Sequence, residues 1–319
     1  MKIVVLDGYT ANPGDLSWEG LQAIGDVILY DYTLAEDVIA RISDAEAVLT
    51  NKVPISAQIM DACPNLKFIC VFATGYNIID LNAARERGIT VSNIPAYSSA
   101  SVAQSVFAFL LEIALHTAHH NDAVHSGRWA ANKIFCFWDT PLVELEGKTL
   151  GIIGCGAIGQ RVAKIAVAFG MKVLANNRTY RPELETESIK LASLDEVLAG
   201  SDYITLHVPQ TPESVGLINR DNIAKMKDGA VIINTARGGC VVEQDVADAL
   251  AAGKLAWYAA DVLSQEPPKA ANPLLTAPHT ILTPHISWAT YEARVRLMEI
   301  TVSNFKAYLA GNSVNVVNS

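Results

Sequence analysis

Short apolar runs alternate with amphipathic stretches along almost the whole chain. In its first part, runs with the composition of buried strands lie at residues 2–7, 26–30, 47–51, 67–73 and 89–92. Stretches with one apolar face, which predict helices, lie between these runs at residues 18–24, 36–42, 56–62 and 81–87. This alternation is typical of a parallel sheet covered by helices on both faces.

A second alternating unit follows a long apolar helix that we expect from about residue 98 to about residue 119. Serines at its start are N-cap candidates. Strand-like runs then lie at residues 172–176, 203–208, 230–235, 257–262 and 280–282, and a last helix is predicted over residues 291–310. The sequence therefore predicts an α/β protein with two doubly wound parallel sheets.

The stretch 149–159, which reads TLGIIGCGAIG, joins a predicted strand to a predicted helix through three glycines. Gly154, Gly156 and Gly159 stand at the first, third and sixth places of the turn. In a dinucleotide-binding turn the first glycine permits a sharp bend, the second lets the backbone approach a pyrophosphate, and the third allows the helix to pack on the strand. The N-terminus of the helix adds unpaired N–H groups. The flanking strand and helix favour a dinucleotide site over a simple glycine-rich turn.

The position of this loop in the middle of the chain predicts the domain organisation. We expect a dinucleotide-binding domain over residues 100–287. A second domain is expected from residues 1–99 and 288–319, because the last helix should rejoin the first unit. Ligands of open parallel sheets bind beyond the carboxyl ends of the strands, so candidate functional residues should follow the predicted strands.

Polar residues suited to one reaction follow the last three strand-like runs, at Arg237, Glu266 and His285. Hydride transfer to a 2-keto acid needs a proton donor for the carbonyl oxygen, and a histidine suits this role because imidazole titrates near neutral pH. Glu266 would orient the ring and favour its protonated form. Arg237 would bind the substrate carboxylate. Taken singly, the three residues also fit a solvated loop arginine, a Glu-Pro pair in a loop and a turn histidine.

These segments resemble the D-isomer-specific 2-hydroxyacid dehydrogenases, most nearly their glycerate dehydrogenase (hydroxypyruvate reductase) branch. The motifs that carry the resemblance are LDGYTANPGDLSWEGL, TNKVPI, ATGYNIID, PAYSSASVAQ, GIIGCGAIGQ, HVPQTPESVGLIN, NTARGG, DVLSQEPP and TPHISWAT. NTARGG, DVLSQEPP and TPHI in this order are specific to the family, and Trp288 fits the branch. The resemblance implies a Rossmann nucleotide-binding domain inserted into a flavodoxin-like substrate domain.

The activity that the resemblance implies is hydride transfer between NAD(P)H and a small 2-keto acid, which gives a D-2-hydroxy acid. Hydroxypyruvate and glyoxylate are the expected substrates. The implied catalytic residues are Arg237, Glu266 and His285, with His285 as acid and base. A phosphoglycerate dehydrogenase-like enzyme is an alternative within the family. A non-enzymatic NAD(H)-sensing corepressor is an alternative of another class, because such proteins retain the catalytic set.

The resemblance also implies residues that bind the two ligands. Those expected to bind the substrate carboxylate are Asn51, Lys52, Ala73, Thr74 and Gly75. Those expected to bind the coenzyme are Gly154, Gly156, Ala157, Ile158, Gly159, Asn177, Arg178, His207, Val208, Pro209, Thr235, Ala236 and Asp261. Within this set, Asp261 is expected to hold the nicotinamide carboxamide.

The choice between NAD and NADP stays open at the end of the strand predicted over residues 172–176. An NAD site favours an acidic residue there, which binds the ribose 2′-hydroxyl. The sequence instead continues with Asn177 and Arg178. Arg178 would pair with a 2′-phosphate. In the alternative, Arg178 faces solvent and Asn177 binds the NAD ribose.

The composition of the chain indicates which kinds of partner and which cell compartment we expect. The net charge of −9 argues against nucleic acid or an anionic membrane as the main partner. The five cysteines contain no CxxC pair, which fits free thiols in a reducing compartment. The chain starts with the strand-like MKIVVLDG and not with a signal peptide. We therefore expect a cytoplasmic protein that acts on a small molecule.

Two further features bear on metals and assembly. His116, His119 and His120 have a spacing that suits a metal, but they also fit a helix C-terminus, where histidine interacts well with the dipole. Because the reaction needs no metal, we expect no metal site. The loop 134–138 reads IFCFW and is more apolar than a free loop should be. The resemblance implies a homodimer arm there, and internal packing is the alternative.

Overall fold

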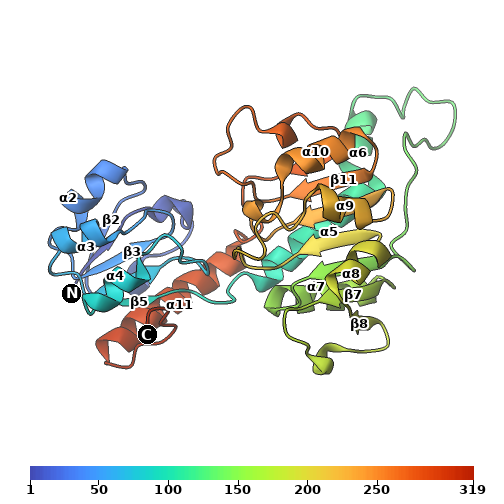
Figure 1. The fold of residues 1–319 in the computed structure, drawn as a ribbon. Coiled ribbons are helices and arrows are strands. Elements are labelled where there is room, and N and C mark those ends of the chain that lie inside the picture. The colour runs from blue at the N-terminus through green and yellow to red at the C-terminus, as the bar shows by residue number, and fades with distance from the viewer. The chain divides into compact units, whose positions relative to one another are not determined.

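A computed structural model describes all of residues 1–319, and the chain divides into two compact units. Unit 1 comprises Met1–Ser98 and Ala289–Ser319, and unit 2 comprises Ser99–Trp288. Each unit is built on one parallel sheet with helices against it (Figure 1). The predicted fold class, α/β with two doubly wound parallel sheets, is confirmed.

Unit 1 contains a five-stranded sheet in the order β2-β1-β3-β4-β5, in which every neighbouring pair is parallel. Its strands are β1 Lys2–Val5, β2 Asp26–Leu29, β3 Ala47–Thr50, β4 Phe68–Val71 and β5 Thr90–Ser92. Its helices and 3₁₀ turns are η1 Gly8–Thr10, α1 Glu19–Gln22, η2 Ala35–Asp37, α2 Val38–Ile42, α3 Ala57–Ala62, α4 Leu81–Glu86 and α11 Tyr291–Leu309. This strand order is the flavodoxin-like one. The central strand β3 and its neighbour β4 are buried at every position, so they form the middle of the core.

The last helix, α11, packs on the strands formed by the start of the chain, as Figure 1 shows for the red helix beside the blue and cyan elements. Phe305 of α11 meets Phe68 of β4 edge to face, with ring centroids 5.0 Å apart. Asn304 donates a hydrogen bond to the Asn93 carbonyl oxygen over 2.9 Å. The C-terminal segment is therefore part of the core of unit 1.

Unit 2 contains a seven-stranded parallel sheet in the order β12-β11-β10-β9-β6-β7-β8. Its strands are β6 Thr149–Ile153, β7 Lys172–Asn176, β8 Ile189–Leu191, β9 Tyr203–Leu206, β10 Ala230–Asn234, β11 Leu255–Ala260 and β12 Thr280–Leu282. Without β12, this is the order of a Rossmann sheet, with β6 as its first strand. The sequence did not predict β8, because the exposed Lys190 interrupts its two apolar residues and leaves no apolar run.

Helices cover both faces of this sheet. They are α5 Ser99–Leu115, α6 Thr117–His125, α7 Ala157–Ala168, α8 Leu194–Gly200, α9 Arg220–Lys225 and α10 Glu243–Ala251, with 3₁₀ turns η3 Pro182–Leu184, η4 Gly238–Cys240 and η5 Pro273–Leu275. Side chains of α5 and α7 share one buried cluster with the strands. Side chains of α8, α9 and α10 share a second cluster with the strands. The candidate functional residues lie in the loops that follow the carboxyl ends of these strands.

The single helix predicted from residue 98 to residue 119 is wrong at its end. It breaks at His116, whose φ of +48° is left-handed, and α6 starts at Thr117 with a bend of 59° between the two helices. The Glu112 carboxylate accepts the Ala118 N–H at 3.2 and 3.3 Å, so a side chain of the first helix caps the second.

No single helix is long and apolar enough to cross a membrane, and α5 with α6 meets the length and composition test only as a bent pair.

Candidate active site

The glycine loop between β6 and α7 has the geometry that its spacing predicts at the first and third glycines. Gly154 adopts a φ of +95°, and a Cβ there would lie 2.8 Å from the carbonyl group of His207. At Gly159, a Cβ would lie 2.4 Å from the Gly154 carbonyl oxygen. Any side chain at either position would push the helix and the strands apart. These two glycines therefore set the turn and the close packing.

The second glycine leaves open space beside the loop, and two buried polar atoms at the ends of β9 and β10 lack a hydrogen-bond partner. A Cβ added at Gly156 would meet nothing within 4 Å, so the backbone of the loop is open to an incoming group. At the ends of β9 and β10, His207 Nδ1 and Thr235 Oγ1 are buried without a hydrogen-bond partner. Burial lowers the pKa of His207 to about 3, so this imidazole is neutral at working pH. Buried polar atoms normally have partners. These residues therefore fit a dinucleotide.

The end of β7 presents donors and no carboxylate. The Asn177 side-chain oxygen accepts the Cys155 N–H of the glycine loop at 2.7 Å. Because a backbone N–H can only donate, this contact fixes the oxygen inward and leaves the Asn177 Nδ2 donors for a ligand. Arg178 follows and is exposed. The end of this strand therefore presents an amide and a guanidinium where an NAD site has an acid.

Three adjacent parallel strands carry the three predicted catalytic residues. β11 pairs with β10 on one side and with β12 on the other, and in this register the ends of all three strands lie together. Arg237, Glu266 and His285 lie in the loops that follow β10, β11 and β12. Their loops therefore leave the same edge of the sheet.

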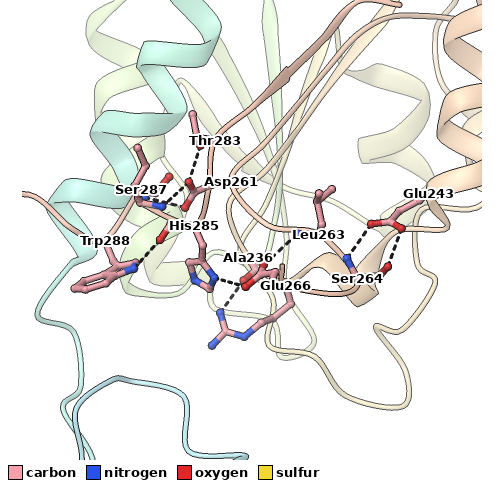
Figure 2. A network of polar contacts seen from close by, with 12 residues as sticks. Ala236, Glu243, Asp261, Leu263, Ser264, Glu266, Thr283, His285, Ser287 and Trp288 are labelled. Atoms are coloured by element: carbon pink, nitrogen blue, oxygen red, sulfur yellow. Dashed lines mark hydrogen bonds and ion pairs between the residues drawn. The ribbon is translucent and has the colours of Figure 1, made fainter. Parts of the chain in front are cut away.

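The structure brings His285 and Glu266 into direct contact, as Figure 2 shows. The distance between His285 Nδ1 and Glu266 Oε2 is 2.6 Å, and the two side chains are 26% and 35% exposed. The other carboxylate oxygen of Glu266 accepts the Leu263 N–H at 3.1 Å. With Nδ1 engaged, Nε2 is the imidazole nitrogen left for proton transfer. The carboxylate stabilises the imidazolium, which is the form that can donate.

Arg237 lies in a loop that touches the Glu266 loop. A Cβ at Gly238 would lie 1.9 Å from the Leu263 carbonyl carbon, so the backbones of the two loops are in contact at this glycine. The half-buried Arg237 side chain donates from Nη1 to the Ala236 carbonyl oxygen at 2.7 Å. The structure therefore pairs Glu266 with His285 and holds Arg237 in the adjoining loop.

Asp261 at the end of β11 binds the turn that carries His285 (Figure 2). Its carboxylate is buried and accepts the Thr283 hydroxyl at 2.6 Å and the backbone N–H groups of Ile286 and Ser287, each at 2.8 Å. A carboxylate has about four acceptor sites. One is left, so contact with the nicotinamide carboxamide stays a prediction.

Two residues hold this region through contacts that the sequence did not predict, although Trp288 itself belongs to a recognised motif. Glu243, the first residue of α10, accepts the N–H and the hydroxyl of Ser264 at 2.8 and 2.7 Å and the Asn272 amide at 2.9 Å. It therefore anchors the loop that contains Glu266. The Trp288 indole N–H donates to the His285 carbonyl oxygen at 2.8 Å. Each contact joins distant or irregular segments, so no spacing rule reveals it.

In unit 1, the residues expected to bind the substrate lie just beyond β3 and β4. The buried Asp7 carboxylate accepts the N–H groups of Asn51 and Lys52 at 2.8 and 2.6 Å. Burial raises the pKa of Asp7, although these two hydrogen bonds oppose the shift. Beyond β4, the amides of Thr74 and Gly75 donate no hydrogen bond within the protein. Hydrogen bonds therefore hold both loops. The loop beyond β4 also has two backbone N–H groups without a partner in the protein.

The three histidines near α6 are engaged separately. His119 Nε2 lies 2.6 Å from the Asp139 carboxylate, and His120 Nδ1 lies 2.8 Å from the His116 carbonyl oxygen. The structure contains no group of three or more His, Cys, Asp or Glu side chains that could hold a metal ion.

A cavity of about 370 Å³ lies at the amino ends of the strands, where His116, Trp257 and His279 line it. This cavity is on the opposite edge of the sheet from His285.

Comparison with known proteins identifies the family. The family model for the D-isomer specific 2-hydroxyacid dehydrogenase, NAD binding domain, matches residues 107–287. The chain is 55% identical over 321 residues to a hydroxypyruvate reductase of Blautia hydrogenotrophica, and the match covers 100% of each chain. The chain belongs to the D-isomer specific 2-hydroxyacid dehydrogenase family. The resemblance predicted from the motifs is thereby confirmed.

Two solved structures of similar proteins show the same fold. A D-lactate dehydrogenase from Aquifex aeolicus, complexed with NAD and lactic acid, has 32% identity and a TM-score of 0.84, and the match covers 98% of this chain and 96% of that one. An acyclic imino acid reductase in complex with NADPH and D-Arg has 30% identity and a TM-score of 0.87, with 99% and 100% covered. The chain is therefore an NAD(P)-dependent oxidoreductase of the 2-hydroxyacid dehydrogenase family.

Replacing Glu266 by glutamine should change the pH dependence of this dehydrogenase. With His285 as the predicted acid, reduction requires its protonated form, so the rate should fall as the pH rises. Glutamine still accepts a hydrogen bond but lacks the negative charge that favours the imidazolium, so the fall should begin at lower pH. Initial rates of keto-acid reduction between pH 5 and pH 10 measure this shift. An alkaline limb that does not move would contradict the coupling between the two residues.

Proposed function

We propose that this protein reduces hydroxypyruvate, and also glyoxylate, to the D-2-hydroxy acid and catalyses the reverse oxidation. The observation that carries this proposal is the 2.6 Å contact of Glu266 with His285, on the sheet that also carries the glycine loop. The relative of 55% identity, named a hydroxypyruvate reductase, supports the choice of substrate.

His285 is the proposed acid of the reduction. The bound coenzyme supplies the hydride that adds to the carbonyl carbon. His285 Nε2 donates its proton to the carbonyl oxygen as negative charge develops there. Glu266 holds the ring through Nδ1 and stabilises the imidazolium before the transfer. In the oxidation, the neutral imidazole takes the hydroxyl proton through the same nitrogen.

Arg237 in unit 2 is a proposed carboxylate-binding group, and the loops of unit 1, taken by themselves, also present donors suited to an anion. A guanidinium is planar and permanently charged, so it suits a carboxylate. The half-buried position of Arg237 and its loop contact at Gly238 support this role. The free amides of Thr74 and Gly75 support a second set of donors, with Asn51, Lys52 and Ala73 beside them. Anions bind well to such groups of backbone N–H donors.

We further propose that the coenzyme site accepts NADPH. Asn177 presents only donors to a ligand, because its oxygen is bound to the Cys155 N–H. A 2′-phosphate is an acceptor and suits these donors, with the exposed Arg178 beside them. Asn176 and Asn177, at the end of β7, carry no carboxylate that would repel the 2′-phosphate of NADPH.

The Asn177→Asp variant tests this preference. Aspartate has nearly the same shape and keeps an acceptor for Cys155, but its charge repels a 2′-phosphate and suits a 2′-hydroxyl. The affinity for NADPH relative to NADH should fall by about tenfold or more, on the order of one like-charge contact. Coenzyme fluorescence titration measures both dissociation constants without turnover. An unchanged ratio would show that this position does not read the phosphate.

We propose that the protein is a homodimer joined through the segment after α6. Large apolar side chains are exposed there, at Trp129, Ile134, Phe135, Trp138 and Leu142, and Phe135 is 86% exposed. A patch of this kind is typical of an interaction surface. Sedimentation should give twice the chain mass, and Phe135→Ser should weaken the dimer, whereas Tyr32→Ser at an exposed aromatic of unit 1 should not. A monomeric wild-type protein would contradict this proposal.

We propose that the protein acts on a small molecule and that it is located in the cytoplasm. All five cysteines are free, which supports a reducing, cytoplasmic compartment. The net charge of −9 supports a small-molecule substrate over nucleic acid or an anionic membrane. Fluorescence microscopy of a tagged protein in its own cell tests the location.

Initial rates test the proposed function directly. We expect the highest kcat/KM for hydroxypyruvate when it is compared with glyoxylate, pyruvate and 3-phosphohydroxypyruvate, each measured with NADH and with NADPH. The His285→Gln variant should lose at least about 100-fold in turnover, the usual contribution of a general acid, while it binds coenzyme normally. A preference for 3-phosphohydroxypyruvate would identify a phosphoglycerate dehydrogenase. Coenzyme binding without turnover of any keto acid would refute the proposed reaction.

A further inference from the structure

The turn that carries His285 has an unusual backbone conformation. His285 has a φ of +56°, in the left-handed region that residues with a side chain seldom adopt. No glycine relieves the strain, so surrounding contacts must hold the conformation. The direction of the imidazole follows from this backbone. Whatever fixes the turn therefore also fixes the contact between His285 and Glu266.

Contacts hold this turn before and after His285. On the β11 side, the Asp261 carboxylate binds the Thr283 hydroxyl and the N–H groups of Ile286 and Ser287. The Ile286 N–H and the His285 carbonyl belong to one peptide unit, so Asp261 holds that unit at its N–H and leaves the carbonyl oxygen for another partner. The indole N–H of Trp288 donates to that carbonyl at 2.8 Å, as Figure 2 shows. The peptide unit that follows the Cα of His285 is thus held at its N–H by Asp261 and at its carbonyl oxygen by Trp288.

We propose that Trp288 is a positioning residue for His285, acting through the hydrogen bond from its indole N–H to the His285 carbonyl oxygen. This inference depends on the proposed role of His285 as the acid. The indole nitrogen can only donate, so it matches a carbonyl oxygen and does not compete for protons at the reacting atoms. Trp288 sets the orientation of the imidazole toward Glu266 and does not itself carry a proton.

The Trp288→Phe variant removes the N–H donor and keeps an aromatic ring. Without the donor, the turn can relax from its left-handed conformation, and the imidazole leaves its alignment with Glu266. The turnover number for hydroxypyruvate reduction should fall by about tenfold, the effect of one lost positioning contact. KM for the keto acid and the dissociation constant of the coenzyme should stay within about twofold.

Trp257→Phe is the matched control. This tryptophan is also half-buried in unit 2, but it lies at the opposite edge of the sheet, between the rings of His116 and His279. The same change of side chain there should leave kcat unaltered. Thr283→Val provides a second test if Trp288→Phe does not fold, because it loosens the same turn from the Asp261 side. It should lower kcat in the same way.

A double-mutant cycle with Glu266→Gln separates positioning from a general structural effect. If Trp288 acts by aligning His285 with Glu266, its removal should cost less in the glutamine background than in the wild type. The alkaline limb of the reduction profile in Trp288→Phe should also move to lower pH, toward the profile of Glu266→Gln. A residue that only supports packing would change neither quantity.

Three results would overturn the inference. The first is an unchanged kcat in Trp288→Phe, or in Thr283→Val if the first variant does not fold. The second is a raised KM with normal kcat, which would make Trp288 a wall of the substrate site. The third is a full, additive loss in the Glu266→Gln background. If His285→Gln keeps normal activity, the proposed function itself fails, and that outcome is distinct from these three.

Discussion

The contact between Glu266 and His285 is the interaction on which the proposed chemistry depends. It joins two side chains from separate loops at 2.6 Å and directs the imidazole by its Nδ1 atom. Neither side chain is deeply buried, so water competes for the contact, and long flexible side chains lose entropy when they are fixed. The pair therefore needs a rigid frame. Much of the polar structure around it serves as that frame.

The frame is built from carboxylates that accept hydrogen bonds from backbone N–H groups. Asp261 holds the turn that carries His285, and Glu243 holds the loop that carries Glu266. Both are carboxylates, which form stronger hydrogen bonds to backbone N–H groups than neutral acceptors do. The parallel sheet places both loops at one edge, because β11 and β12 are adjacent and in register. The sheet thus provides proximity, and these carboxylates provide orientation.

The sequence predicted those features that depend on a local backbone requirement. The glycine loop was recognisable because each of its glycines answers a specific demand: a positive φ at Gly154, open space at Gly156 and close packing at Gly159. The strand ends that carry Glu266 and His285 were predictable because the apolar runs before them are continuous. Most of the strands were placed within a few residues for the same reason.

Features that depend on contacts between distant residues were not predictable. The break at His116 arises because a glutamate of the preceding helix caps the next one, and apolar periodicity does not reveal this. The short strand β8 has too few buried residues to produce a pattern. Glu243 acts through three hydrogen bonds to a loop 21 or more residues away, and Trp288 acts through one bond within an irregular turn; only the folded chain creates them. The inward orientation of Asn177 likewise comes from a partner in another loop.

Nitrogen-15 NMR of the histidine side chains tests the central interaction most directly. The chain has seven histidines, and the His285→Gln variant assigns the signal of His285. The account predicts that His285 keeps its proton on Nδ1, facing Glu266, when it becomes neutral at high pH, and that Nε2 is the nitrogen that loses its proton. A neutral His285 with its proton on Nε2, or a titration of His285 that Glu266→Gln leaves unchanged, would contradict it.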